Sequence, residues 1–238
     1  MVFRPDETTI VVIGQVTPER AKAAIEKYFG QWQATEPKPN TLLPPVPPNL
    51  PATVAVPDAS RVQDKVILAE TVGLTRNNPD YYALVLGNHV LGGGFYATRL
   101  YQQLREETGL VYNVGVELDA TQTRAVYAID YGCNPDNVGK ARAIVDRNLV
   151  EMQTRLVGPD ELRQAKAMLL KEITLSESSL SSIAQDLISR SILDLPLDEP
   201  TIAAQHYAAM TAEQVRAAFA KWLRPADLVQ VTQGPSQR

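Results

Sequence analysis

A proline-rich stretch between Glu36 and Pro51 divides the chain and limits what either side of it can fold into. It contains two proline pairs, at 44–45 and 47–48. Proline lacks a backbone N–H and has a fixed φ, so such a run cannot form a helix or a central strand and favours an extended connection. We therefore expect three parts: residues 1–35, a linker over residues 36–51, and a unit over residues 52–238.

The two ends of the chain share a pattern. Residues 3–14 and 223–234 align without a gap, and in both an Arg-Pro pair precedes an alternating segment that stops at a glycine. An offset of one domain length indicates a duplicated architecture. Residues 1–35 are therefore expected to be the last strand and helix of a preceding, similar domain, with coincidence between two short strands as the alternative. The identical pairs are Arg4 and Arg224, Pro5 and Pro225, Val11 and Val231, and Gly14 and Gly234.

Hydrophobic periodicity, capping residues and glycine stops predict an α+β fold, in which helices cover an antiparallel sheet. Two alternating segments on either side of residues 119–123 predict a hairpin. The expected order is helix 17–30, strands 52–56 and 64–72, helices 79–92 and 97–108, strands 110–118 and 124–133, helix 134–152, a helix from 158 that could continue, bent, to 193, helix 211–222 and strand 227–233.

Composition excludes several classes of protein. The 238 residues carry a net charge of −4 and no basic patch interleaved with aromatics, so we expect no nucleic-acid partner. There is no run of about 18 apolar residues, so we expect no membrane span. The polar N-terminus does not resemble a signal peptide, so a signal, if the natural protein is exported, would lie outside this sequence. Bacterial periplasm and cytoplasm both stay open as locations.

The segment from Leu91 to Gly115 holds the residues best suited to chemistry, because a glycine run, an amphipathic helix and a strand follow one another there. Arg105 near the end of the helix and Tyr112 on the strand can project to the same side. A cationic fork beside a phenol suits an oxyanion or a peptide carbonyl. The simpler interpretation is that Arg105 belongs to a solvated charge cluster with Glu106 and Glu107, and that Tyr112 is an ordinary strand aromatic.

The other candidate residues give weaker indications of function. Gly92, Gly93 and Gly94 form a turn or hinge that allows close packing; a phosphate loop would need a following Gly-Lys-Ser/Thr. The chain has two histidines, His89 and His206, and no HxxEH, so we expect no metal site and no cofactor in this chain. The lone Cys133 excludes an internal disulfide, and with no activating neighbour it is not expected to be a nucleophile.

These motifs resemble the M16 family of zinc metallopeptidases, the group of pitrilysin, insulinase and the mitochondrial processing peptidase. The similarity rests on the glycine run at 92–94 before Thr98-Arg99-Leu100, on Leu104-Arg105-Glu106 followed by Gly109-Leu110-Val111-Tyr112, and on the strand at 10–14 with the helix that ends Tyr28-Phe29-Gly30. It implies a metallohydrolase-like two-layer sandwich of the M16/LuxS type. The chain resembles the second, zinc-free domain of a half-enzyme that carries an arginine–tyrosine pair.

The resemblance also implies a function and partners. In this family two halves enclose a chamber; one half carries HxxEH and the zinc, and the other carries the arginine–tyrosine pair that contacts the peptide substrate. Arg105 and Tyr112 would have that role here, with an HxxEH-bearing domain or subunit as partner, in a homo- or heterodimer. No proteolysis is expected from this chain alone. A proteolytically inactive scaffold of the same fold is the main alternative, and an independent enzyme that uses the glycine loop is another.

Overall fold

A five-stranded sheet forms the centre of the molecule, in the order β1-β5-β2-β4-β3. The computed structural model describes residues 3–93 and 96–235. Three of the four strand pairings are antiparallel, as predicted, whereas the edge strand β1 runs parallel to β5. The chain reaches β5 only after all the helices, so no hairpin dictates that pairing. The strands are β1 (Thr53–Pro57), β2 (Asp64–Val72), β3 (Val111–Ala120), β4 (Ala125–Cys133) and β5 (Val229–Gly234).

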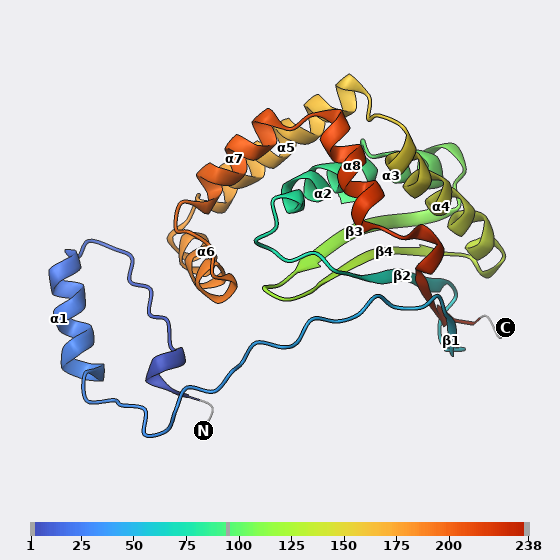
Figure 1. Ribbon diagram of the computed structural model, residues 1–238. Coiled ribbons are helices and arrows are strands. Elements are labelled where there is room, and N and C mark those ends of the chain that lie inside the picture. The colour runs from blue at the N-terminus through green and yellow to red at the C-terminus, as the bar shows by residue number, and fades with distance from the viewer. Residues whose placement is uncertain (1–2, 94–95, 236–238) are drawn as a thin grey trace.

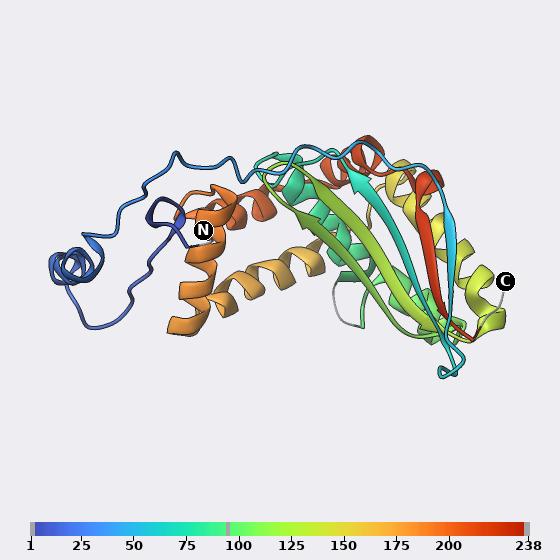
Figure 2. The same cartoon turned by 90° about the horizontal axis from the view of Figure 1, so that it is seen from below.

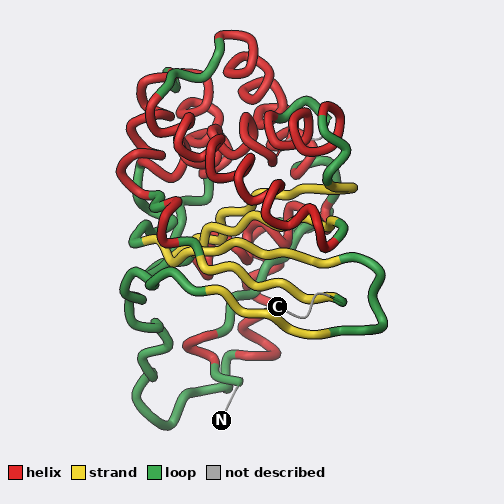
Figure 3. Tube along the Cα trace, turned by 90° about the vertical axis from the view of Figure 1, so that its right-hand side faces the viewer, coloured by secondary structure: helices red, strands yellow, loops and turns green. Residues whose placement is uncertain are grey.

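Helices cover one face of this sheet (Figures 1 and 2). Along β2 and β4 every second side chain is buried, and these include Leu68, Tyr127 and Ile129, all with no exposed area. The alternate residues of both strands are at least partly exposed. Figure 3 shows the strands as one layer beside the helical layer. The helices of the layer are α2 (Asp80–Asn88), α3 (Arg99–Tyr101), α4 (Val138–Thr154), α5 (Pro159–Ser176), α6 (Leu180–Leu193), α7 (Glu199–Ala209) and α8 (Ala212–Trp222).

The helix boundaries differ from the sequence prediction at two places. The helix allowed to continue, bent, as far as residue 193 is two helices, α5 and α6, because Ser179 caps a new N-terminus by accepting a hydrogen bond from the Ser182 N–H at 3.1 Å. No prediction covered α7. Its N-cap residue, Asp198, makes no side-chain capping bond, so the usual signal of a helix start is missing there.

Most of the N-terminal segment stands apart from the helical layer (Figure 1), and the Thr9 hydroxyl lies 2.8 Å from that of Ser191 in α6. The N-terminal segment holds α1 (Pro18–Phe29), which begins where Thr17 accepts a hydrogen bond from the Arg20 N–H at 3.3 Å. Residues 10–14, predicted to be a strand, are not in a strand and pair with no other strand among the described residues. A strand is defined by its ladder, and no strand in the described part of the chain pairs with this segment to provide one. The predicted division at 35 and 51 stays a prediction.

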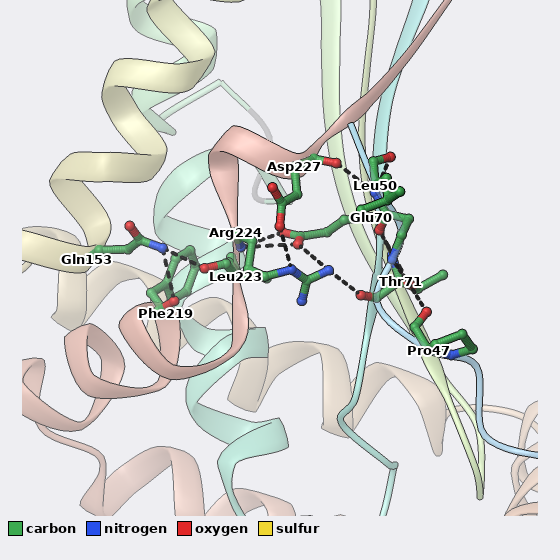
Figure 4. Close-up of polar contacts among 10 residues, drawn as sticks. Pro47, Leu50, Glu70, Thr71, Gln153, Phe219, Leu223, Arg224 and Asp227 are labelled. Atoms are coloured by element: carbon green, nitrogen blue, oxygen red, sulfur yellow. Dashed lines mark hydrogen bonds and ion pairs between the residues drawn. The ribbon is translucent and has the colours of Figure 1, made fainter. Parts of the chain in front are cut away.

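A polar corner ties the end of the linker to the sheet (Figure 4). The Arg224 guanidinium donates to the backbone oxygen of Thr71 and to the Asp227 carboxylate, both at 3.0 Å, while the Arg224 N–H donates to the buried Glu70. The Asn49 side-chain amide donates to the Asp227 carbonyl at 2.6 Å, and its oxygen accepts from the Thr71 N–H at 2.8 Å. These bonds fix where the linker ends and β1 begins.

The corner at Arg224 has a counterpart at Arg4. Each arginine is followed by a short 3₁₀ turn that starts with proline, Pro225–Asp227 in one case and Pro5–Glu7 in the other. Arg4 donates to the Asp6 carboxylate at 2.9 and 3.0 Å and to the backbone oxygen of Glu36 at 2.7 Å. The sequence repeat between the two ends is therefore also a repeat of local structure.

Candidate functional site

Arg105 and Tyr112 meet at the edge of the sheet. The guanidinium carbon of Arg105 lies 4.9 Å from the centre of the Tyr112 ring. Tyr112 is 70% exposed, and 35% of the Arg105 side chain is exposed. Both groups are therefore accessible to a ligand, and neither is buried within the domain.

A π-helical turn places Arg105. The helix that starts as α3 (Arg99–Tyr101) widens over Gln102–Glu107, and turns of this kind are frequent at functional sites. The turn closes when the Leu110 N–H donates to the Leu104 carbonyl at 2.8 Å. Gly109, with φ of +61°, then reverses the chain into β3 in a left-handed conformation that suits glycine.

A β-bulge places Tyr112. Val111 pairs with Cys133 and Val114 pairs with Tyr131, so the two residues between them, Tyr112 and Asn113, face a single residue of β4. Such a bulge bends the strand and redirects side chains at a sheet edge. Both Tyr112 and Asn113 are exposed. The alternating pattern predicted a regular strand here and contained no sign of the bulge.

The electrostatics leave the guanidinium of Arg105 open to a ligand. In the described part of the chain no hydrogen bond reaches it, and Glu106 lies 4.0 Å from its Nε. The guanidinium carbon of Arg105 also lies 5.1 Å from the ring centre of Tyr101. Desolvation raises the pKa of Tyr101, and the charge of Arg105 acts in the opposite direction. The N–H donors of Arg105 are thus available for a carbonyl, a carboxylate or an oxyanion.

Tyr101 is the residue that the sequence analysis missed. It precedes Arg105 by four positions, and on a helix that spacing brings two side chains together. The spacing was therefore a usable signal.

Gly92 allows the end of α2 to pack closely against β3. A methyl group at Gly92 would lie 2.5 Å from Val116 Cγ2 on β3, and Gly93 ends a π-helical turn, His89–Gly93, that extends α2. Gly94, the third predicted residue, lies outside the described residues. The first regular helical segment after the run, α3, has three residues, too few to form an anion site at its N-terminus.

The other titratable side chains considered in the sequence analysis do not gather into one site. His89 pairs with Glu172 at 3.2 Å, and His206 stacks on Tyr82 with ring centres 4.2 Å apart. Burial raises the pKa of the Cys133 thiol to about 11, which disfavours the reactive thiolate. Across residues 3–93 and 96–235 no cluster of three or more His, Cys, Asp or Glu side chains is placed to hold a metal ion. The described residues therefore do not fit a zinc site. No helix in the same residues is long and apolar enough to span a bilayer.

These features define a class: a two-layer α+β domain whose described residues present an exposed arginine–tyrosine pair but no metal-ligand set. The profile of the peptidase M16 inactive domain matches residues 1–169. The chain therefore belongs to the M16 peptidase family, as an inactive domain.

Individual relatives agree with the family. The uncharacterized zinc protease YmxG of Bacillus subtilis (strain 168) is 23% identical over 180 residues, which are 76% of this chain and 42% of that protein. The crystal structure of a peptidase M16 inactive domain from Pseudomonas fluorescens is 26% identical and superposes with a TM-score of 0.83, over 94% of this chain and 53% of that one. A Helicobacter pylori protease has the same TM-score at 16% identity, over 94% and 54% of the two chains, and shows the fold alone. The chain spans about half the length of these relatives.

Proposed function

We propose that this chain is a non-catalytic domain of an M16-type zinc metallopeptidase, in which it helps to enclose a chamber and contacts peptide substrates through Arg105 and Tyr112. The zinc and its HxxEH ligands would belong to a partner domain or subunit. The name of the Bacillus subtilis relative, a zinc protease, supports zinc in the assembly. The absence of a fitting donor set among the described residues is the reason to assign the metal to a partner.

The observation that carries this proposal is the open pair at the edge of β3. Arg105 has N–H donors without partners in the described residues, and the exposed phenol of Tyr112 lies against its guanidinium. Two donors side by side would bind the carbonyl of an extended peptide and would bind it more tightly as its oxygen becomes negative. A pair buried in packing within the domain would instead have favoured a scaffold.

We propose further that residues 1–35 complete a second domain of the same kind. The Arg4 corner matches the Arg224 corner, and the segment after Arg224 is β5, an inner strand of the sheet. By the same arrangement residues 9–14, which align with β5, would be an inner strand of a similar sheet. Their unpaired backbone and the exposed apolar side chains of Ile10 and Val12 support this assignment.

The test of the function is peptidase activity on an unstructured peptide, with the full-length protein in the presence and absence of an HxxEH-bearing partner. Activity should require the partner, and Arg105→Ala and Tyr112→Phe should each lower kcat/KM by about a hundredfold while zinc stays bound. The control is Arg163→Ala, which removes an arginine from an exposed ion pair with Asp160 and should leave activity unchanged. Full activity in both site variants would remove the substrate-contact role and leave a scaffold of the same fold.

A further inference from the structure

Arg105 is oriented by aromatic rings and by little else. Its guanidinium carbon lies 5.1 Å from the ring centre of Tyr101 and 4.9 Å from that of Tyr112. Both distances are within the range of a cation–π contact. Hydrogen bonds, the usual means of orienting a guanidinium, are missing within the described part of the chain, and the nearest carboxylate oxygen is at 4.0 Å.

The rings of Tyr101 and Tyr112 are held in place by different contacts. Tyr112 is in the bulge of an edge strand and is 70% exposed. Tyr101 is half-buried at the end of α3, and its ring packs edge-on against Tyr96 with centres 5.0 Å apart. The Tyr96 carbonyl in turn accepts a hydrogen bond from the Gln102 side chain at 2.8 Å. Tyr101 is therefore the better-anchored of the two contacts of Arg105.

A ring contact of this kind has a chemical advantage over a salt bridge. A carboxylate would occupy the N–H donors of Arg105, whereas the face of an aromatic ring holds the cation and leaves the N–H donors free. The long arginine side chain would otherwise lose rotamer entropy whenever it ordered around a substrate.

We propose that Tyr101 is a positioning residue for Arg105: its ring holds the guanidinium in place beside Tyr112, so that the N–H donors are ordered before the peptide arrives. This inference rests on the proposed function, because the benefit appears only when Arg105 binds substrate. Tyr101 acts through the guanidinium, and its hydroxyl is dispensable.

A double-mutant cycle tests the role in the paired enzyme. Tyr101→Leu should lower kcat/KM by about threefold to tenfold, the range for one cation–π contact, and Tyr101→Phe should retain full activity because the ring remains. In an Arg105→Ala background Tyr101→Leu should cause no further loss. Tyr101→Met, a second ring-free variant, covers the case in which Tyr101→Leu does not fold. An equal loss in both backgrounds, or a loss in Tyr101→Phe, would overturn the positioning role.

A second readout does not depend on activity. In the 238-residue chain the Arg105 Hε resonance should lie upfield, because it is close to two rings, and in Tyr101→Leu it should move downfield and show greater mobility in ¹⁵N relaxation. An unchanged resonance and mobility would overturn the inference even if Arg105 proves essential. If instead Arg105→Ala is fully active, the proposed function fails, and the resonance shows whether Tyr101 orders the side chain at all.

Discussion

At the scale of single residues, Gly87 shows how little room the helical layer leaves. It lies where α2 crosses α8, and a methyl group there would be 2.1 Å from Phe219 Cε2 and 3.0 Å from Val215 Cγ1. Both Phe219 and Val215 are fully buried, so neither ring nor methyl has free space to move into. Gly87→Ala should lower the free energy of unfolding by about 2 kcal/mol, a typical cost of overpacking, as measured by urea denaturation.

Gly139 provides the matched control for this prediction. It lies in α4, its backbone φ is not in the left-handed region, and a methyl group there would meet nothing within 4 Å. Gly139→Ala should therefore stabilise the chain by about 0.5 kcal/mol through its higher helix propensity. Similar effects of the two alanines would show that crowding between α2 and α8 is not the cause.

Glu161 gives a prediction about pH. Its carboxylate accepts two hydrogen bonds from Arg99, at 2.6 and 2.7 Å, and one from the Gly158 N–H at 2.7 Å. The bonds from Arg99 are the main cause of its lowered pKa. The unfolded chain therefore binds the proton more readily, and the stabilisation is complete above the ordinary pKa of 4.5 and is lost as the pH falls through the folded value.

Glu161→Gln should accordingly destabilise the chain at pH 7 by about 1 kcal/mol, a solvent-screened value because the side chain is 35% exposed. The difference between variant and wild type should shrink as the pH falls below 4.5, because the unfolded wild type then takes up its proton, and it should vanish below the folded pKa, where residue 161 is neutral in both proteins. Urea denaturation at about pH 7 and about pH 3.5 measures it. A difference that stays constant between these pH values would rule out the ionised carboxylate as its source.

At the scale of elements, the turn between α3 and β3 sets the geometry of the candidate site. Gly109 has φ of +61°, and a methyl group there would meet nothing within 4 Å, so its conformation, and not crowding, requires glycine. Gly109→Ala should cost about 1 kcal/mol in urea denaturation, because a Cβ disfavours the left-handed region. Asparagine tolerates that region, so Gly109→Asn should recover most of the loss; equal losses in both variants would contradict this explanation.

The elements themselves were largely predictable. Capping residues and periodicity indicated the hairpin of β3 and β4, and the starts of α1 and α8, because those signals are local. The π-helical turn at Gln102–Glu107 and the bulge at Tyr112 were not predictable. Both are departures from regular geometry that depend on how α3 and β3 pack on the rest of the sheet, and periodicity describes only the regular case.

At the scale of the whole molecule, the N-terminal segment leads to a prediction about assembly. In this chain the amides of residues 9–13 make no backbone hydrogen bond within the described part, so they should exchange with deuterium rapidly. Binding to an HxxEH-bearing M16 domain that lacks its own last strand should protect them strongly, because they would enter a sheet ladder.

Residues 230–233 of β5 are the internal control, since they pair on both sides in the isolated chain and should be protected with or without the partner. Rapid exchange of residues 9–13 in the presence of a bound partner would contradict their assignment as an inner strand.

Residue patterns alone were enough to predict the fold class, the family resemblance and the two residues of the candidate pair, because spacing along a helix and a strand places Arg105 and Tyr112 near each other. The three-dimensional structure was needed to show that the pair is exposed, that a bulge presents Tyr112, and that β1 runs parallel to β5. Exposure, the bulge and long-range strand pairing depend on how segments far apart in the chain pack together, and local residue patterns do not say which segments meet.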